Sequence, residues 1–213
     1  DQHHIERLDA SYVLSETLDQ CRLYVQTQLH ADSLVRIDLL DGNRVVASEK
    51  RSCAAGESSF VLTVDYPKLW FPTGYGPQPI YTLRAVTLDA GGCILDEKIR
   101  KIGFRRTRLL MNEGSWANPS RFPKSRSDAP ITLEVNGKRI FAKGSNWVNA
   151  HIFPGVLTGA DYSELLSLVQ GANMNILRIW GGGFVNHESF FDLCDEKGIM
   201  VWQEFPLACN EYP

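Results

Sequence analysis

Apolar and polar residues alternate in short stretches through the first half of the chain. Residues 21–29 show this clearly, because every second side chain is apolar, as in a strand with one buried face. Further short strands are predicted at 34–40, 44–47, 60–64, 81–85 and twice within 94–107, with a hairpin turn at Asp41-Gly42-Asn43. Together these strands predict an antiparallel immunoglobulin-like β-sandwich over residues 12–111. Residues 1–11 are polar without a period and are interpreted as a linker or a tag remnant.

The second half of the chain has a different pattern. Residues 112–130 are rich in Ser, Pro, Asn and charge, which predicts a connection between domains. A hairpin around Asn136-Gly137 follows at 131–143. Beyond it, continuous apolar strands at 175–180 and 199–205 alternate with two predicted helices. Strand, helix, strand, helix, strand is typical of a parallel sheet covered by helices, in a barrel or a doubly wound sheet.

The two helices are predicted from their ends as well as from their apolar positions. Thr158 and Asp161 form a capping-box pair at the start of a helix over 158–173. Its apolar stripe consists of Tyr162, Leu165, Leu166, Val169 and Ala172. Asn186 is predicted to cap the second helix, and Gly198 to stop it.

The stretch Asn175-Ile-Leu-Arg-Ile-Trp-Gly-Gly-Gly183 carries the clearest candidate chemistry. Alternation places Arg178 and Trp180 on one face of a strand, and the three glycines allow a sharp turn after it. A buried Arg needs a partner, so Arg178 either binds a ligand or forms an ion pair, with Glu204 as one candidate. Trp202 lies on the same face but deeper, where we expect core packing.

Composition excludes several classes of function. The chain has 213 residues, 44% of them apolar, and a net charge of −3 without a basic run, so no nucleic-acid partner is expected. No apolar run reaches the ~18 residues of a membrane span, and no signal-like segment opens the chain, so no membrane partner is expected either.

Cofactor chemistry is also poorly supported. The five cysteines are widely and irregularly spaced, which favours buried free thiols and leans towards a reducing, cytoplasmic compartment. His151 and His187 with Cys194 and Cys209 lack ligand-like spacing. Residues 181–183 lack the spaced glycines and the Lys of phosphate-binding loops. We therefore expect no metal and no cofactor.

Three ordered motifs carry a resemblance to a known family: Lys143-Gly-Ser-Asn-Trp147, then Ala172-Asn-Met-Asn-Ile-Leu-Arg-Ile-Trp-Gly-Gly-Gly183, then Phe191-Asp-Leu-Cys-Asp-Glu-Lys-Gly-Ile-Met-Val-Trp-Gln-Glu-Phe205. They resemble the start of the catalytic barrel in glycoside hydrolase family 2, closest to its β-mannosidase branch. The resemblance covers about residues 12–205 and implies an immunoglobulin-like sandwich followed by the first strands and helices of a (β/α)8 TIM barrel. Residues 131–213 are about a third of the ~250 residues that such a barrel takes. The chain is therefore interpreted as a fragment.

The resemblance also implies which catalytic groups are missing. A retaining glycosidase needs an acid/base Glu and a nucleophile Glu, which in this family follow the fourth and seventh barrel strands. Asn112-Glu113 lies in the connection, and Asn210-Glu211 follows the third-strand motif with no helix between, so neither pair fits the acid/base position. We expect no catalytic carboxylate in the chain and no activity from it alone.

The residues expected to line the sugar site fall at the carboxyl ends of the predicted barrel strands. They are Asn146, Trp147, Arg178, Trp180 and Glu204. Asn146 and Trp147 are weighed between site lining and packing. Glu204 stands where many β-mannosidases have Asp, so the resemblance leaves the sugar open. Trp70 and Tyr75 offer either a sugar-stacking platform or packing contacts.

The sequence is compatible with several functions. The first is an exo-acting β-mannosidase on terminal β-D-mannosides, with a β-linked glycoside and the rest of its own polypeptide as partners. Exo-β-glucosaminidase and endo-β-mannosidase activity are the alternatives within the family. A noncatalytic carbohydrate-binding or scaffold protein built on the sandwich is the alternative outside it.

Overall fold

The computed structural model describes residues 3–114 and 130–208. The chain divides into two compact units. The first unit comprises Asp1–Lys68 and Pro79–Phe104, and the second comprises Leu69–Gln78 and Arg105–Pro213.

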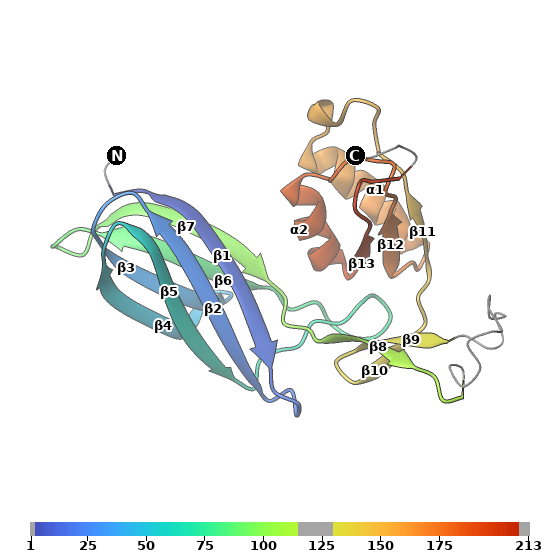
Figure 1. The fold of residues 1–213 in the computed structure, drawn as a ribbon, viewed down its shortest axis with the longest axis horizontal. Helices are drawn as coiled ribbons and strands as arrows, with labels where there is room; N and C mark the ends of the chain where they lie inside the picture. Colours follow the sequence, from blue (N-terminus) through green and yellow to red (C-terminus); the bar gives the residue numbers. More distant parts are fainter. Residues whose placement is uncertain (1–2, 115–129, 209–213) are drawn as a thin grey trace. The chain divides into compact units, whose positions relative to one another are not determined.

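The first unit is an antiparallel β-sandwich, drawn in blue to green in Figure 1. One sheet has the order β1-β2-β5 and the other β4-β3-β6-β7. The strands are β1 (Ile5–Leu14), β2 (Gln20–Leu29), β3 (Ser33–Asp41), β4 (Arg44–Cys53), β5 (Gly56–Asp65), β6 (Tyr81–Leu88) and β7 (Ile94–Ile102). Val25, Ile37 and Leu83 are fully buried and belong to its core. The predicted sandwich is therefore confirmed.

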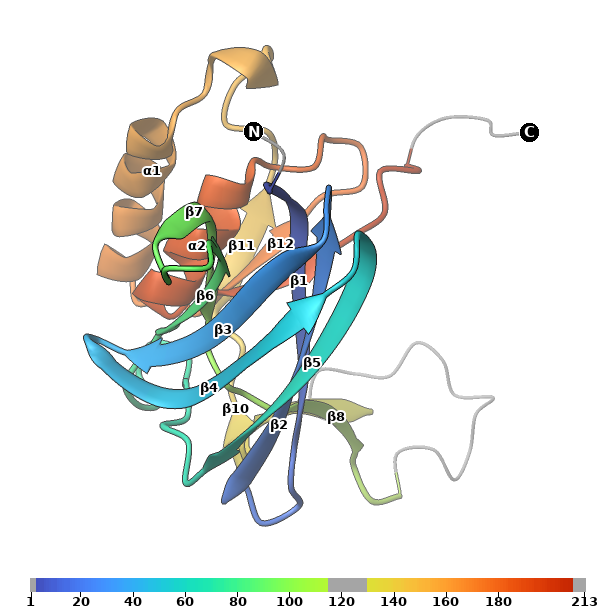
Figure 2. The same cartoon turned by 90° about the vertical axis from the view of Figure 1, so that its left-hand side faces the viewer.

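The alternating pattern of the sequence corresponds to burial in these strands. In β2 the side chains of Cys21, Leu23 and Val25 are buried, and the residues between them are exposed. The β3–β4 hairpin, visible in Figure 2, turns at Gly42 with a positive φ of 60° between paired Asp41 and Arg44. This is the turn that the sequence predicts.

The beginning of the chain differs from the expectation of a polar linker at residues 1–11. β1 starts at Ile5, and the side chains of Ile5 and Leu8 are each only 1% exposed. The register of β1 against β2 shifts between Ile5 and Arg7, which marks a bulge. Because a bulge adds a residue to one strand, it breaks the period of two and hides the strand from a periodicity argument.

A small antiparallel sheet with the order β10-β9-β8 lies in the second unit. It consists of β8 (Thr107–Met111), β9 (Ile131–Val135) and β10 (Lys138–Ile140). Asn136 and Gly137 both have positive φ, at 50° and 79°, as the predicted hairpin turn requires. Residues 107–111 were expected in the sandwich, but they pair with β9. Most of the predicted connection, 115–129, lies outside the described residues.

The rest of the second unit alternates parallel strands with helices, as the sequence predicts. The strands β11 (Gly144–Trp147), β12 (Ile176–Ile179) and β13 (Met200–Gln203) form a parallel sheet in that order. After β11 come a short 3-10 turn, η1 (Pro154–Val156), and helix α1 (Gly159–Gly171), and α2 (Glu188–Lys197) connects β12 to β13. Both helices contribute to one core cluster, in which Leu166, Leu177 and Phe190 are buried.

The helix ends confirm one capping prediction and correct another. Thr158 and Asp161 form the predicted capping box of α1. Gly198 ends α2 in the left-handed conformation, also as predicted. The N-cap of α2, however, is His187 rather than Asn186. Asn186 is used elsewhere, because its Oδ1 accepts a hydrogen bond from Trp147 Nε1 at 3.3 Å.

The segment Leu69–Gln78 packs against the end of α2. Trp70 is fully buried, and its Nε1 donates to the carbonyl oxygen of Asp195 at 2.7 Å. The guanidinium carbon of Arg105 lies 4.4 Å from the centre of the Trp70 ring. Of the two roles considered for Trp70, the structure therefore supports packing and excludes a sugar-stacking platform. Tyr75 also has a structural contact, since its hydroxyl accepts a hydrogen bond from the Phe141 amide at 2.8 Å.

The cysteines and the helices agree in part with the sequence-based expectations. Cys21, Cys53, Cys93 and Cys194 are free thiols, and Cys21 and Cys194 are buried as predicted, whereas Cys93 is exposed. Cys209 lies outside the described residues. In the described ranges, the helices are too short and too polar to cross a bilayer.

Candidate functional site

The carboxyl ends of the three parallel strands bring polar side chains together on one face. The register places Asn146 of β11 opposite Arg178 of β12, and Arg178 opposite Trp202 of β13. Residues aligned in this way point to the same side of the sheet, and successive residues point to opposite sides. Leu177 and Ile179 are buried in the cluster that the helices share. Arg178 and its neighbours therefore occupy the face away from the helices.

Arg178 is the centre of a polar network on this face. Its Nε donates to Glu204 Oε1 at 2.7 Å, and its Nη2 lies 2.6 Å from the same oxygen. Its Nη1 donates to Asn146 Oδ1 at 2.9 Å. The side chains of Arg178 and Glu204 are 35% and 27% exposed, so the pair is partly screened from water. One of the two alternatives for Arg178, an ion pair with Glu204, is thus present.

The second oxygen of Glu204 is held by the backbone. The amide of Gly181 donates to Glu204 Oε2 at 2.9 Å. A side chain at Gly181 would place Cβ 2.7 Å from the carbonyl oxygen of Phe205 and 3.2 Å from Glu204 Oε2, so the close approach requires glycine. The sequence shows the glycines but not this role, because the amide reaches Glu204 only once β12 and β13 are paired.

These contacts keep Glu204 ionised. The hydrogen bond from the Gly181 amide, followed by that from Arg178, holds the pKa of Glu204 below its ordinary value, against a smaller opposing effect of burial. A carboxylate with a lowered pKa accepts hydrogen bonds at neutral pH but is a poor proton donor. The geometry therefore suits Glu204 to binding hydroxyl groups and not to general-acid catalysis.

Trp180 directly follows β12 and packs on the glycine turn. The turn is closed by a hydrogen bond from the Gly183 amide to the Trp180 carbonyl at 3.1 Å. A Cβ at Gly182 would lie 2.3 Å from two carbons of the Trp180 ring. The indole is partly exposed and contacts this backbone closely, so the conformation of the turn and the position of the ring depend on each other.

The adjacent residues Asn146 and Trp147 have different roles. Asn146 is exposed and belongs to the Arg178 network. Trp147 is only 9% exposed and packs against Phe190, with the ring centres 5.0 Å apart. Because neighbours on a strand point to opposite faces, only one of the two can reach the site face. Of the two alternatives, site lining and packing, the structure supports packing for Trp147.

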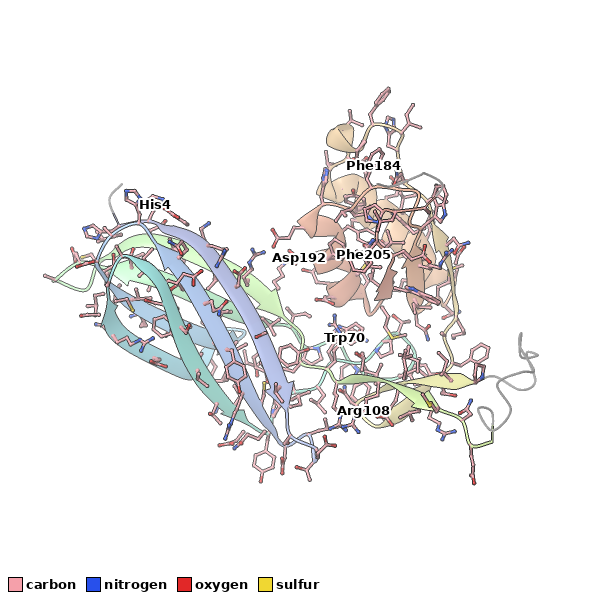
Figure 3. All side chains as sticks on the ribbon, viewed as in Figure 1. His4, Trp70, Arg108, Phe184, Asp192 and Phe205 are labelled. Atoms are coloured by element: carbon pink, nitrogen blue, oxygen red, sulfur yellow. The ribbon has the colours of Figure 1, made fainter. Side chains whose placement is uncertain are left out.

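The core position predicted for Trp202 is not seen within the residues that the structure describes. We expected it to be a core residue, but its side chain is 59% exposed. It is aligned with Arg178 on the face that α1 and α2 leave uncovered, and among the described residues this face has no second layer. The apolar residues Phe184 and Phe205, labelled in Figure 3, are also exposed, at 52% and 83%.

Of the two Asn-Glu pairs of the sequence, Asn112-Glu113 is described by the structure and lies apart from this network. Asn112 accepts a hydrogen bond from the Thr132 hydroxyl and donates to the Pro130 carbonyl, so it closes the end of the β8–β9 pairing. Asn210-Glu211 lies outside the described residues. The network itself holds one carboxylate, whereas glycoside hydrolysis needs two. It can bind a polyhydroxylated ligand, but it lacks a complete catalytic pair.

Comparison with known proteins gives consistent matches. The family model described as glycosyl hydrolases family 2 matches residues 3–105. β-Mannosidase B of Thermothelomyces thermophilus is 36% identical over 181 residues, which cover 84% of this chain and 20% of that protein. The β-mannosidase of Bos taurus is 40% identical over 144 residues, covering 68% of this chain and 15% of that protein. The chain thus spans about a fifth or less of the length of these relatives.

Solved structures give the same picture. The crystal structure of a β-D-mannosidase from Dictyoglomus thermophilum aligns with all of this chain and 26% of its own, with a TM-score of 0.79 and 30% identity. A β-glucuronidase from Parabacteroides merdae aligns with 96% of this chain and 24% of its own, with a TM-score of 0.75. At 21% identity the second likeness concerns the fold alone.

Proposed function

Because the chain belongs to glycosyl hydrolase family 2, we propose that it is an internal part of a retaining exo-β-glycosidase that hydrolyses terminal β-D-mannosides. The observation that carries this proposal is the network in which Arg178 holds Glu204 and Asn146 at the carboxyl ends of three parallel strands. Relatives named β-mannosidase, at 36% and 40% identity, support the choice of sugar.

The proposal includes the architecture of the second unit. We infer that β11, β12 and β13 with α1 and α2 are the start of a TIM barrel whose other strands come from the rest of the polypeptide. Support comes from the parallel order β11-β12-β13, with a helix between successive strands on one face. The exposure of Trp202 also supports it, because residues on this side of a barrel strand face the closed interior. The start of the barrel domain at residue 131 remains a prediction.

Each site residue then has a role in holding one sugar. The ionised carboxylate of Glu204 accepts hydrogen bonds from sugar hydroxyls. Arg178 positions Glu204 and Asn146, and Asn146 offers an amide to a neighbouring hydroxyl. The indole of Trp180 offers an apolar face to the ring of the sugar. Trp147 supports this rim from the core side instead of touching the ligand.

The test is an activity assay on the complete gene product. We expect hydrolysis of an aryl β-D-mannoside with retention of configuration, and little hydrolysis of the matching β-D-glucosaminide. Replacing Glu204 by Gln removes the charge that orients Arg178 and should lower kcat/KM about 100-fold, the scale expected when a binding group is misplaced. Glu164→Gln, an exposed change on α1, is the matched control and should leave kcat/KM unchanged.

The outcomes separate the alternatives. Preference for the glucosaminide indicates an exo-β-glucosaminidase, and cleavage inside a mannan chain indicates an endo-acting enzyme. Binding without hydrolysis of any of these substrates indicates a carbohydrate-binding scaffold and refutes the enzyme proposal. The isolated 213-residue chain should be inert towards all of them, and turnover by it would place a catalytic pair within this sequence.

A further inference from the structure

A cluster of three metal-binding side chains lies in the first unit, separate from the network in the second. His4 precedes β1 (Figure 3 labels it), Glu6 lies in β1, and His30 directly follows β2. The amide of His30 donates to the carbonyl of His4 at 3.2 Å, so the two histidines are cross-strand neighbours. Their rings stack with centres 4.8 Å apart and planes inclined by 23°. Glu6 adds a carboxylate beside both rings.

We propose that His4, Glu6 and His30 form a surface site for a divalent transition-metal ion, with Zn²⁺ as the best match. Two imidazoles and one carboxylate are a donor set that Zn²⁺ uses in proteins, with water in the remaining position. The carboxylate also offsets part of the charge of the ion. The proposal is independent of the glycosidase function, because none of its residues belongs to the Arg178 network.

The distances agree with this assignment. Ligand atoms that are each ~2.0–2.1 Å from a tetrahedral ion lie ~3.4 Å from one another. Glu6 Oε1 is 3.4 Å from His30 Nδ1 and 4.0 Å from His4 Nε2, and the ligand atoms of the three residues all lie within 4.8 Å. The side chains of His4, Glu6 and His30 are 42%, 45% and 54% exposed, so they can rotate to close the longer gaps.

The position of the cluster indicates what the ion would do. β1 is at the edge of the β1-β2-β5 sheet, so within this sheet it is held by β2 on one side alone. The backbone there is also bonded to the other sheet, since the Ile5 amide donates to Asp96 Oδ2 at 2.7 Å. An ion shared by His4 and His30 would fasten β1 to β2 beyond the last ladder pair, Ile5 with Leu29.

The sequence suggested no metal site, for a clear reason. His4 and His30 are far apart in the chain, and only the antiparallel pairing of β1 with β2 makes them neighbours. The cysteines and histidines that we considered from the sequence were different residues. Among the described residues, the one group of three or more such side chains with converging ligand atoms is His4, Glu6 and His30.

Calorimetric titration of the untagged protein with ZnCl₂ tests the proposal. We expect one Zn²⁺ per chain, and a Kd that rises at least about tenfold in His30→Ala and in Glu6→Ala, because each variant loses a ligand. Zn²⁺ should also slow hydrogen exchange of the Ile5 and Leu8 amides in the wild type but not in either variant. Circular dichroism without metal checks that both variants keep the wild-type fold.

Two matched variants make the outcome decisive. His151→Ala removes an exposed histidine of the second unit and should leave the Kd for Zn²⁺ unchanged. His3 is the neighbour of His4 in the chain, but the ring of His3 is hydrogen-bonded to the Ser33 hydroxyl at 3.1 Å. His3→Ala should therefore also leave the Kd for Zn²⁺ unchanged. The proposal is overturned if wild-type protein binds no Zn²⁺, or if His30→Ala binds it as tightly as wild type. It is overturned equally if His3→Ala loses as much affinity as His30→Ala.

Discussion

Replacing Trp70 by alanine should strongly destabilise the second unit. The indole is fully buried, its Nε1 donates to the Asp195 carbonyl, and Arg105 lies over its ring. Truncating a buried Trp to Ala costs about 3–5 kcal/mol, which includes the cavity that remains. Trp70→Phe keeps most of the ring but loses the hydrogen bond, so about 1–2 kcal/mol is expected. The free energy of unfolding of this unit should therefore fall in the order wild type, Phe, Ala.

Tryptophan fluorescence measures this unit selectively. All five tryptophans of the sequence fall within 69–78 or 105–213, and the first unit has none. Urea unfolding followed by this signal therefore reports the second unit. With a typical slope of about 1–3 kcal/mol per molar urea, a loss of 3–5 kcal/mol lowers the midpoint by at least about 1 M.

The matched control is Trp202→Ala in the same 213-residue chain, where this tryptophan is 59% exposed. A surface change of this kind should alter the unfolding free energy by no more than about 0.5 kcal/mol. If Trp70→Ala and Trp202→Ala shift the urea midpoint equally, the argument that burial and the Asp195 contact anchor the segment Leu69–Gln78 is refuted.

Three further predictions concern the site and the thiols. Gly182→Ala should displace the Trp180 ring, because the new Cβ at position 182 would lie 2.3 Å from two ring carbons. The near-ultraviolet circular dichroism should therefore change, and an unchanged spectrum would contradict the packing of Trp180 on the turn. NMR titration should give Glu204 a pKa below its ordinary value. The contribution of ionised Glu204 to stability is therefore fully present at a pH above the ordinary pKa of Glu and is lost as the pH falls through the lowered pKa. A raised pKa would contradict the hydrogen bonds from Gly181 and Arg178. In native protein at pH 8, iodoacetamide should label the exposed Cys93 and spare Cys21, because burial raises the pKa of Cys21 to about 12. Equal labelling of the two cysteines, measured by peptide mass, would show that Cys21 is accessible.

Local pattern predicted the elements well wherever one physical signal dominated. Alternation located β2, and the capping pair Thr158 and Asp161 located the start of α1. The prediction failed where a second interaction competed with that signal. Asn186 has the side chain of a helix cap, yet its Oδ1 accepts from Trp147 instead. Whether such a residue caps a helix depends on which donor its side chain reaches. For Asn186 that donor is Trp147 Nε1, which lies in β11.

The candidate site shows the same division. Alternation in 175–180 predicted that Arg178 and Trp180 share a face, because the period of a strand is a property of the backbone. It could not predict that Arg178 would bond to both Glu204 and Asn146. Asn146 lies in β11 and Glu204 directly follows β13, so their alignment with Arg178 depends on the register of three strands.

What the sequence determined by itself is local: the positions of most strands and of α1 and α2, the faces of those strands, and the turns that need positive φ. What only the tertiary structure decided is which faces are covered and which distant residues meet. Trp202 is exposed because the helices cover the other side of its sheet, and the Gly181 amide holds Glu204 because two strands are paired. The reason is that periodicity follows from backbone geometry within one element, whereas burial and pairing depend on how separate elements pack.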